Sequence, residues 1–269
     1  LVVVAALVFG IDLSGGGGGT GSLGPLQDLG GQQVGTPSAN NTGIAQECRT
    51  GADADTKEDC RIVGYVNSIQ SYWKGAFQEG SYRSAKTLFF DGSISTGCGP
   101  ATSAVGPFYC PADGYVYIDL GFFDELKSRF GAKGGPFAQA YVLAHEYGHH
   151  VQDLLGVLGQ GTGQQGATGA SVRTELQADC YAGVWAKEAN AMHVAKGLQP
   201  YIDRQDIDEA LNAASAVGDD TLQRKYQGRV VPETFTHGSA QQRSMWFKRG
   251  FESGPGQAWT QACNTFDAR

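Results

Sequence analysis

Apolar residues recur along the chain at two spacings, one typical of helices and one typical of strands. A spacing of three to four residues predicts helices over residues 59–78, 122–130, 137–155, 171–189, 206–226 and 239–251. Short runs rich in aromatic and branched side chains predict strands over residues 86–90 and 115–120. The second strand would be either an edge strand able to pair with an extended peptide or a central strand. A few strands followed by helices indicate an α+β fold, mostly helical with a small sheet.

The most strongly predicted helix, residues 137–155, begins after Pro136 and ends before Gly156, which are typical first and closing residues of helices. The helix that follows it has Ser171 as its expected N-cap. A glycine-rich stretch separates the two helices and is predicted to be a loop. This loop would be either a mobile lid over a cleft or a plain connector.

The beginning of the chain, residues 1–9, is apolar and uncharged. A bilayer span takes about 20 residues, so this segment is expected to be the outer end of a truncated membrane anchor. The core of a signal peptide and a buried strand are the alternatives. The glycine-rich stretch after it, with the run 15–19, is expected to be a flexible tether. We therefore divide the chain into an anchor (1–10), a tether (11–45) and a folded domain (46–269), anchored to a membrane and lying outside the cytoplasm, on the cell-envelope or periplasmic side.

Composition narrows the function classes. The chain has 269 residues, of which 41% are hydrophobic, enough for one large domain with a buried core. It carries 27 Asp and Glu residues against 20 Lys and Arg, a formal net charge of -7, and the basic residues do not cluster. Binding to a phosphate backbone needs clustered cations, so a nucleic-acid partner is not expected.

The six cysteines form no C-x-x-C pair, which argues against a zinc ribbon or a thioredoxin-type site. Four of them form two local pairs among Gly, Asp and Pro residues, and the remaining two lie far apart in the chain. Disulfides formed in an oxidising compartment are expected, with reduced thiols in a cytosolic protein as the alternative. The expected pairs are Cys48 with Cys60, Cys98 with Cys110, and Cys180 with Cys263.

The strongest predicted helix carries an H-E-x-x-H motif, His145-Glu146-Tyr-Gly-His149. Residues four apart lie on one face of a helix, so both imidazoles can reach one metal ion, and imidazole is a good zinc ligand. Glu146 lies one position round the helix, where it can take a proton from a water instead of binding the metal. His150 points about 100° away from His149 and is expected at the surface or beside the ligands.

A catalytic zinc site needs a third protein ligand and a position left for water. The next predicted helix supplies Glu175 and, one turn later, Asp179 on the same face. Glu175 can bind the ion, and Asp179 can accept the N–H of a ligand histidine and so fix its tautomer. These residues predict one Zn2+ per chain, held by His145, His149 and Glu175.

The H-E-x-x-H and E-x-x-x-D motifs resemble the two zinc helices of the gluzincins. Together with further segments that occur in the same order along the chain, they resemble the bacterial neutral zinc metallopeptidase family. The resemblance covers the chain from about Cys48 onward. It implies a zincin-like fold, zinc ligands at the three positions given above, a base at Glu146, and an N-terminal membrane segment followed by glycine. The segments that carry it are Cys60-Arg-Ile-Val-Gly-Tyr-Val-Asn, Gly106-Pro-Phe-Tyr-Cys-Pro, residues 144–152 and 175–183, and Thr236-His-Gly-Ser-Ala-Gln-Gln-Arg.

The expected activity is that of a zinc-dependent endopeptidase acting on a peptide or protein substrate. Glu146 would remove a proton from water and later deliver it to the leaving amine. His237, in a loop predicted before the last helix, is the expected donor to the oxyanion, with Tyr147 and Tyr181 as further candidates. The alternatives are a catalytically inactive zinc-binding envelope protein with a structural or regulatory role, and a metal-dependent hydrolase of an ester or cell-wall amide.

Overall fold

The structure is a computed structural model that describes residue 44 and residues 47–159, 163–195, 202–253 and 258–266. The expected membrane anchor and nearly all of the expected tether lie outside these residues, so both remain predictions. Across the part of the chain that is described, no helix combines the length and the apolar character needed to cross a bilayer.

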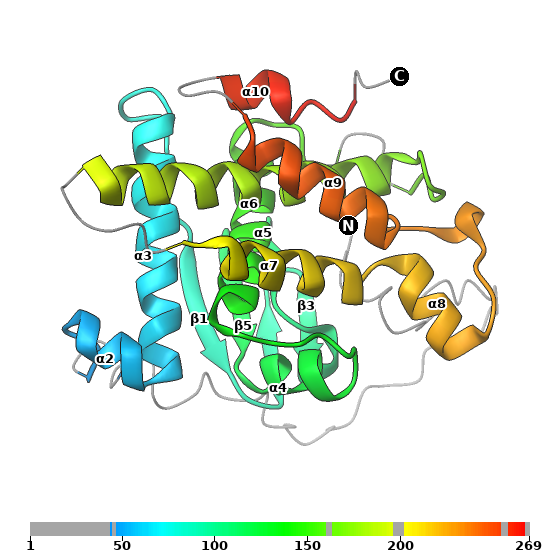
Figure 1. The fold of residues 1–269 in the computed structure, drawn as a ribbon, viewed down its shortest axis with the longest axis horizontal. Helices are drawn as coiled ribbons and strands as arrows, with labels where there is room; N and C mark the ends of the chain where they lie inside the picture. Colours follow the sequence, from blue (N-terminus) through cyan, green and yellow to red (C-terminus); the bar gives the residue numbers. More distant parts are fainter. Residues whose placement is uncertain (1–43, 45–46, 160–162, 196–201, 254–257, 267–269) are drawn as a thin grey trace, which may run out of the picture.

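Helices make up most of the described chain, as the apolar spacing predicts (Figure 1). The long helices are α3 (Glu58–Ala76), α5 (Pro136–Leu154), α6 (Ala170–Ala195), α7 (Arg204–Ala216) and α9 (Ala240–Phe251). The shorter ones are α2 (Gly51–Thr56), α4 (Gly121–Ser128), α8 (Asp219–Gln227) and α10 (Ala258–Ala262), with 3-10 turns at Ser103–Val105 and Pro232–Thr234.

Short strands form two small sheets. β1 (Lys86–Phe90) runs parallel to β5 (Tyr115–Asp119), and β4 (Phe108–Cys110) lies antiparallel on the other side of β5. β2 (Ser93–Thr96) and β3 (Gly99–Thr102) pair with each other as an antiparallel hairpin. The strand β5 is therefore central, and the alternative that made it an edge strand is wrong. The mostly helical α+β fold with a small sheet is confirmed.

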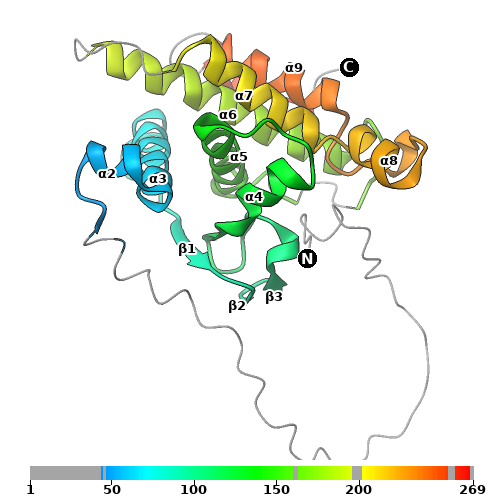
Figure 2. The ribbon, with the colours of Figure 1, turned by 60° about the horizontal axis from the view of Figure 1, so that its bottom comes forward.

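The helix α5 lies between the strands and a layer formed by α6, α7 and α9 (Figure 2). It is buried around its circumference, at nearly every position from Phe137 to Gln152. A helix enclosed on all sides belongs to the core of a domain. The helix that carries the H-E-x-x-H motif is thus part of the core of the domain.

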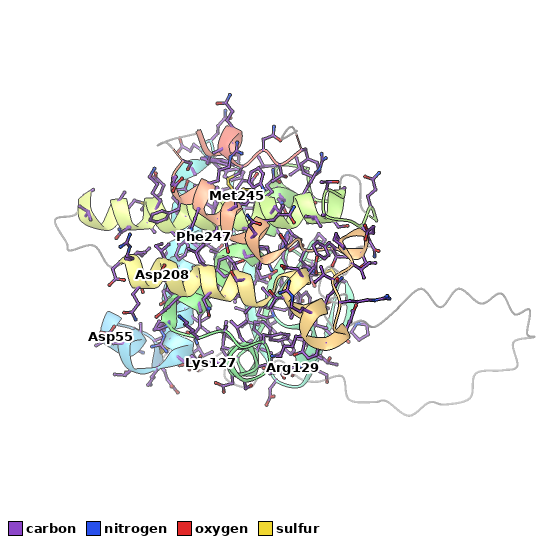
Figure 3. The ribbon with its side chains drawn as sticks, turned by 45° about the vertical axis from the view of Figure 1, so that its right-hand side comes forward. Asp55, Lys127, Arg129, Asp208, Met245 and Phe247 are labelled. Atoms are coloured by element: carbon purple, nitrogen blue, oxygen red, sulfur yellow. A yellow bond between two sulfur atoms is a disulfide. The ribbon has the colours of Figure 1, made fainter. Side chains whose placement is uncertain are left out.

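Helix α9, in the outer layer, has one side buried in the core and one side exposed to solvent. On α9, Phe247 is 1% exposed and Met245 is 52% exposed, and both are labelled in Figure 3. The helix begins after Ser239, whose side-chain oxygen accepts a hydrogen bond of 3.2 Å from the amide of Gln242. The predicted last helix is confirmed, and its N-cap fixes the direction in which the preceding loop enters it.

Glycines bring the backbones of α5, α6 and α9 close together. A Cβ atom on Gly148 of α5 would lie 3.0 Å from the Cα atom and carbonyl oxygen of Ala178 on α6. A Cβ atom on Gly183 of α6 would overlap the backbone of α9, and one on Gly250 of α9 would overlap the carbonyl of Cys180. Any larger residue at these crossings would push the helices apart.

The predicted helix over residues 206–226 is wrong in one respect, because it is two helices. α7 ends before Val217, the chain turns at Gly218, and α8 begins at Asp219. A Cβ atom on Gly218 would overlap the backbone of Ala240 at the start of α9. The break therefore results from a tertiary contact that the apolar spacing does not reveal.

Two further differences concern short-range details. α6 begins at Ala170, so Ser171 lies inside its first turn and the prediction of an N-cap there is wrong. The strands β2, β3 and β4 have no counterpart among the predicted elements. Each is three or four residues long and lies among Gly and Pro residues, which leaves too few positions to establish an alternating pattern.

The expected disulfides are present, and all six cysteines are paired. One bridge ties the start of α3 to the segment before α2, one ties β4 to the β2–β3 turn, and one ties α6 to the C-terminal segment. The pairs are Cys48–Cys60, Cys98–Cys110 and Cys180–Cys263. The alternative of reduced thiols is not supported.

We expect Gly250→Ala to destabilise the domain by about 1–3 kcal/mol or more, because the added methyl group overlaps the backbone of α6. Gly64→Ala is the matched control, since its Cβ atom would meet only Ala54 at 4.0 Å. That substitution lies in the exposed interior of α3 and should stabilise the helix by about 0.5–1 kcal/mol. Urea unfolding of both variants measures the difference, and equal stabilities would contradict the close crossing of α6 and α9.

Candidate metal centre

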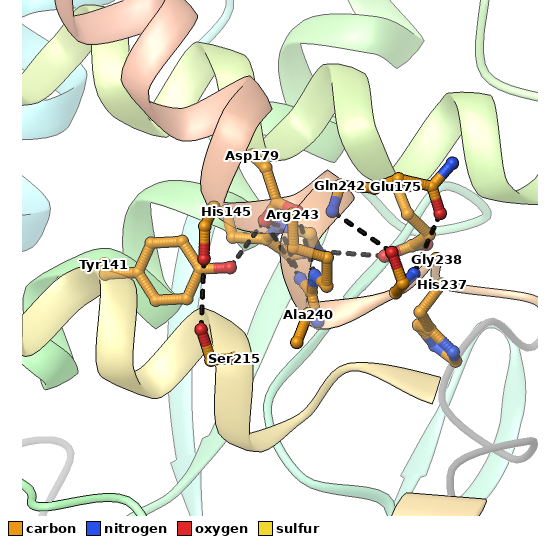
Figure 4. A network of polar contacts seen from close by, with 12 residues as sticks. Tyr141, His145, Glu175, Asp179, Ser215, His237, Gly238, Ala240, Gln242 and Arg243 are labelled. Carbon is orange, nitrogen blue, oxygen red and sulfur yellow. Dashed lines mark hydrogen bonds and ion pairs between the residues drawn. The ribbon is translucent and has the colours of Figure 1, made fainter. Parts of the chain in front are cut away.

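Three buried side chains from two helices lie close together in the interior of the fold. His145 and His149 come from α5, and Glu175 comes from α6. His145 and Glu175 are labelled in Figure 4. Oε2 of Glu175 lies 3.0 Å from Nε2 of His145, and Oε1 lies 3.5 Å from Nε2 of His149. One ligand atom from each residue lies within 4.8 Å of the other two. The structure thus brings together the three residues predicted to bind zinc.

The donor set fits a zinc ion. Ligand atoms bonded at about 2.0–2.1 Å to a tetrahedral ion lie about 3.3 Å from one another, which falls between the two observed separations. Oε1 of Glu175 is buried and has no hydrogen-bond partner among the described residues. The imidazole Nε2 of His149 lies 3.5 Å from it. A buried anionic oxygen that accepts no hydrogen bond is costly unless a cation is bound. Two imidazoles and a carboxylate without a thiolate suit Zn2+.

The carboxylate of Glu175 is ionised in this arrangement. Burial alone would raise its pKa, but His149 and His145 beside it hold the pKa well below its usual range. An ionised carboxylate is the form that binds a metal. The two imidazoles therefore prepare the third ligand even before any ion is present.

Asp179 lies where the sequence predicts it, next to His145, one of the predicted ligands. Its Oδ1 atom is 2.8 Å from Nδ1 of His145 and accepts a hydrogen bond of 2.5 Å from the hydroxyl of Tyr141. A carboxylate at this position holds the proton on Nδ1 and turns Nε2 toward the ion. Tyr141 precedes His145 by one helical turn on α5, so the spacing of residues could have suggested it.

Arg243 of α9 completes this cluster and was not found from the sequence. Its Nε and Nη2 atoms donate to the two carboxylate oxygens of Asp179 at 2.8 and 2.9 Å. Burial alone would raise the pKa of Asp179, but Arg243 and His145 lower it to about 2. The bidentate pair keeps a buried carboxylate ionised and fixes its orientation toward the ligand histidine.

Glu146 faces the same cavity as the triad. The amide of Tyr109, on strand β4, donates to its Oε2 atom at 3.1 Å. Burial raises the pKa of Glu146, although His145 and His149 nearby oppose the shift. A carboxylate with a raised pKa, oriented by a fixed donor and placed beside a metal site, can accept and return a proton near neutral pH.

His237 also lines the cavity and comes from the loop before α9. Burial alone would lower its pKa, but Asp219 and Glu175 raise it. The loop is held by Asp219, whose Oδ2 atom accepts hydrogen bonds of 2.7–2.9 Å from the amides of Thr236, His237 and Gly238. Asp219 was missed from the sequence because its partners lie 17 to 19 residues away.

Three other candidates lie elsewhere. The hydroxyl of Tyr147 is bonded to Thr87 at 2.7 Å, and the ring of Tyr181 packs edge-on against Trp73 at 5.5 Å, so neither tyrosine reaches the cavity. His150 is buried, with Nε2 2.6 Å from the carbonyl oxygen of Arg83. The expectations of an oxyanion donor at either tyrosine and of a surface position for His150 are not supported.

A cavity of about 480 Å3 extends from the triad between the β2–β4 segment on one side and the helices on the other. The triad, Glu146 and His237 are among its polar lining groups, and most of its wall is apolar. The larger aliphatic residues and phenylalanines that line it are Val105, Phe108, Phe122, Phe130, Val142, Leu158 and Val217. A buried metal site beside a mainly apolar cavity is the usual setting of a binding or catalytic centre.

Two histidines and a carboxylate from adjoining helices, next to a cavity, define a candidate mononuclear metal site of the kind found in zinc hydrolases. The chain belongs to a family described as "Putative neutral zinc metallopeptidase", whose model matches residues 1–266. This finding confirms the resemblance drawn from the sequence motifs, and the family name implies zinc.

Relatives of the chain occur in distant bacteria. Uncharacterized protein Rv2575 of Mycobacterium tuberculosis and uncharacterized protein Mb2605 of Mycobacterium bovis are each 51% identical over 226 residues, which is 82% of this chain and 75% of theirs. Uncharacterized protein YpfJ of Escherichia coli K12 is 52% identical over 193 residues, 69% of this chain and 63% of its own length. No solved structure matches the chain. The likeness to a zincin fold therefore stays a prediction.

We expect zinc binding to release a proton and to strengthen as the pH rises. Burial alone would lower the pKa of His145, but Asp179 and Glu175 raise it to about 10 in the metal-free protein. The imidazole is therefore protonated at neutral pH, and zinc must displace that proton. Chelator competition should give an association constant that rises about tenfold per pH unit between about pH 6 and 8. An affinity that is constant over this range would contradict the assignment of His145 as a ligand.

Proposed function

We propose that the chain is a zinc-dependent endopeptidase that hydrolyses peptide bonds with a water activated by Glu146. The observation that carries this proposal is the convergence of His145, His149 and Glu175 beside a cavity that Glu146 and His237 also line. His145, His149 and Glu175 would hold the zinc ion, which would supply Lewis acidity to lower the pKa of water and polarise a carbonyl.

Glu146 acts as the proton carrier in this proposal. Its carboxylate accepts a proton from the attacking water while the water oxygen bonds to the carbonyl carbon of the substrate. The same carboxyl group then gives the proton to the amine nitrogen as the carbon–nitrogen bond breaks. The raised pKa of Glu146 supports both halves of this cycle, because the group must be deprotonated at first and protonated later.

His237 supplies a donor to the oxygen that becomes negative when water attacks. Its Nδ1 atom is 2.8 Å from the hydroxyl of Thr236 and 3.5 Å from Oδ1 of Asp219, which leaves Nε2 as the nitrogen for the substrate. Its raised pKa favours the charged imidazolium, a strong donor. A donor that is fixed before the reaction stabilises the transition state without reorganisation.

The donor set favours an enzyme over an inert zinc protein. Structural zinc sites are closed by four protein ligands, mostly Cys and His. Here three side chains with metal-binding atoms meet at this site among the described residues, and the described cysteines are all in disulfides. The cavity beside the triad leaves room for water and substrate. The inactive envelope protein is therefore less well supported than an enzyme. The family description, which names a metallopeptidase, supports peptide bonds over an ester or a cell-wall amide as the substrate.

The cellular setting is also part of the proposal. Three disulfides favour an oxidising compartment over the cytosol. Together with the apolar segment at residues 1–9, they support a catalytic domain on the outer side of a membrane that the N-terminal segment anchors. The substrates would then be peptides or proteins of the cell envelope or periplasm.

We expect Glu146→Gln to lower peptidase activity about 100- to 10,000-fold, because the amide cannot accept the proton. Zinc content should stay near one ion per chain, since Glu146 is not a ligand. The measurement is turnover of a fluorescence-quenched peptide library alongside metal analysis, with the exposed Glu252→Gln as a control for loss of charge. Full activity of the Glu146 variant would rule out the proposed mechanism.

We expect His237→Ala to lower kcat about 100- to 1,000-fold with little change in KM, because the donor acts on charge that develops in the transition state. His237→Gln keeps an N–H donor and should retain more activity than the alanine variant. Steady-state kinetics on one peptide selected from the library tests this. A rise in KM at constant kcat would instead make His237 a residue that binds the ground state.

A further inference from the structure

Two buried glutamines lie behind the ligand His149, at the junction of α5 and α6. Gln152 is 1% exposed and Gln177 is 6% exposed. Oε1 of Gln152 is 2.8 Å from Nδ1 of His149, and Nε2 of Gln152 donates to the carbonyl oxygen of Thr174 at 2.7 Å and to Oε1 of Gln177 at 3.0 Å. Nε2 of Gln177 donates to the carbonyl oxygen of Cys263 at 3.0 Å.

The direction of this chain of hydrogen bonds is fixed by its two backbone carbonyls, because a carbonyl oxygen can only accept. The carbonyl of Cys263 requires the NH2 group of Gln177 on its side, so Oε1 of Gln177 points to Gln152. The carbonyl of Thr174 likewise requires the NH2 group of Gln152. Turning either amide over would place two acceptors against each other at hydrogen-bond distance.

The orientation of the Gln152 amide determines the tautomer of the proposed ligand His149. Since Oε1 of Gln152 faces His149, the ring nitrogen Nδ1 must carry a proton to form this hydrogen bond. The tautomer that this favours leaves the lone pair on Nε2, the atom that lies 3.5 Å from Oε1 of Glu175. The glutamines therefore select the form of His149 that can bind an ion.

We propose that Gln152 and Gln177 are positioning residues that hold His149 in its metal-binding tautomer. We call the chain of hydrogen bonds from the Cys263 carbonyl through Gln177 and Gln152 to His149 the relay, and the Cys263 carbonyl sets its direction. The Cys180–Cys263 disulfide ties that segment to α6, three residues after Gln177. The proposal rests on the zinc site described above and not on peptide hydrolysis.

The two ligand histidines are thus oriented in different ways. His145 faces the ionised Asp179, which Arg243 neutralises, whereas His149 faces an uncharged amide. A carboxylate in place of Gln152 could accept from His149 but could not donate to the carbonyl of Thr174 or to Gln177. Only an amide side chain can accept on one side and donate twice on the other.

The test compares zinc affinity in three variants of similar side-chain volume. Gln152→Met removes the acceptor and should raise the zinc dissociation constant about 10- to 100-fold. Gln177→Met does not touch His149 but should raise it about 3- to 10-fold, because Gln152 loses one of its two acceptors. The control is Gln139→Met, a buried glutamine on the same helix bonded to Glu58 and Arg61, which should leave the affinity unchanged.

The double variant separates a relay from two independent packing defects. If Gln177 acts through Gln152, the Gln152→Met/Gln177→Met double variant binds zinc about as weakly as Gln152→Met alone. Without the Gln152 amide, no hydrogen bond connects Gln177 to His149. Affinity losses that multiply in the double variant would overturn the relay. So would a Gln152→Met variant that binds zinc as tightly as Gln139→Met.

A second measurement needs neither zinc nor a variant that folds. Nitrogen-15 NMR of the histidine rings in the metal-free wild-type protein should find His149 protonated at Nδ1. Finding the lone pair at Nδ1 would overturn the proposal directly. Failure of the wild-type protein to bind zinc would remove the metal site itself. Hydrolysis that survives in Glu146→Gln would remove only the peptidase mechanism and leave the relay intact.

Discussion

The close crossing of three helices is the constraint on which the rest of the structure depends. Gly148, Gly183 and Gly250 remove the side chains that would keep α5, α6 and α9 apart. At the spacing that results, Glu175 of α6 reaches the two histidines of α5, and Arg243 of α9 reaches Asp179 from the other side. Helices packed at an ordinary distance would hold the same residues too far apart to share one ion.

Buried charge is balanced around this crossing. Glu146, Glu175 and Asp179 carry negative charge, and Arg243 carries one compensating positive charge, held by hydrogen bonds to both oxygens of Asp179. With the ligand imidazoles neutral, as metal binding requires, a divalent ion at the triad would bring the sum of these four side-chain charges and its own charge to zero. Buried charges are tolerated when they are paired or coordinate a metal. The excess of carboxylates and the Glu175 oxygen that accepts no hydrogen bond therefore both indicate that a cation binds here.

The parts of the site that could be predicted are those that local periodicity encodes. His145 and His149, and likewise Glu175 and Asp179, are four residues apart on long helices, so sequence alone places each pair on one face. Their partners on other elements carry no such signal. Arg243 meets Asp179 only because α9 crosses α6, and the break at Gly218 exists only because α9 begins there. The short strands escaped prediction because three or four residues among Gly and Pro cannot show a period.

Because the proposed zinc ligands come from two helices that are separate until they dock, the unfolded chain has no comparable site. An ion that binds only the docked form adds to the free energy of folding, by about 1.4 kcal/mol for every tenfold excess of free ion over its dissociation constant. The folded population of such a domain then follows the metal content of its surroundings. Scarcity of zinc would then act on the amount of intact protein as well as on its chemistry.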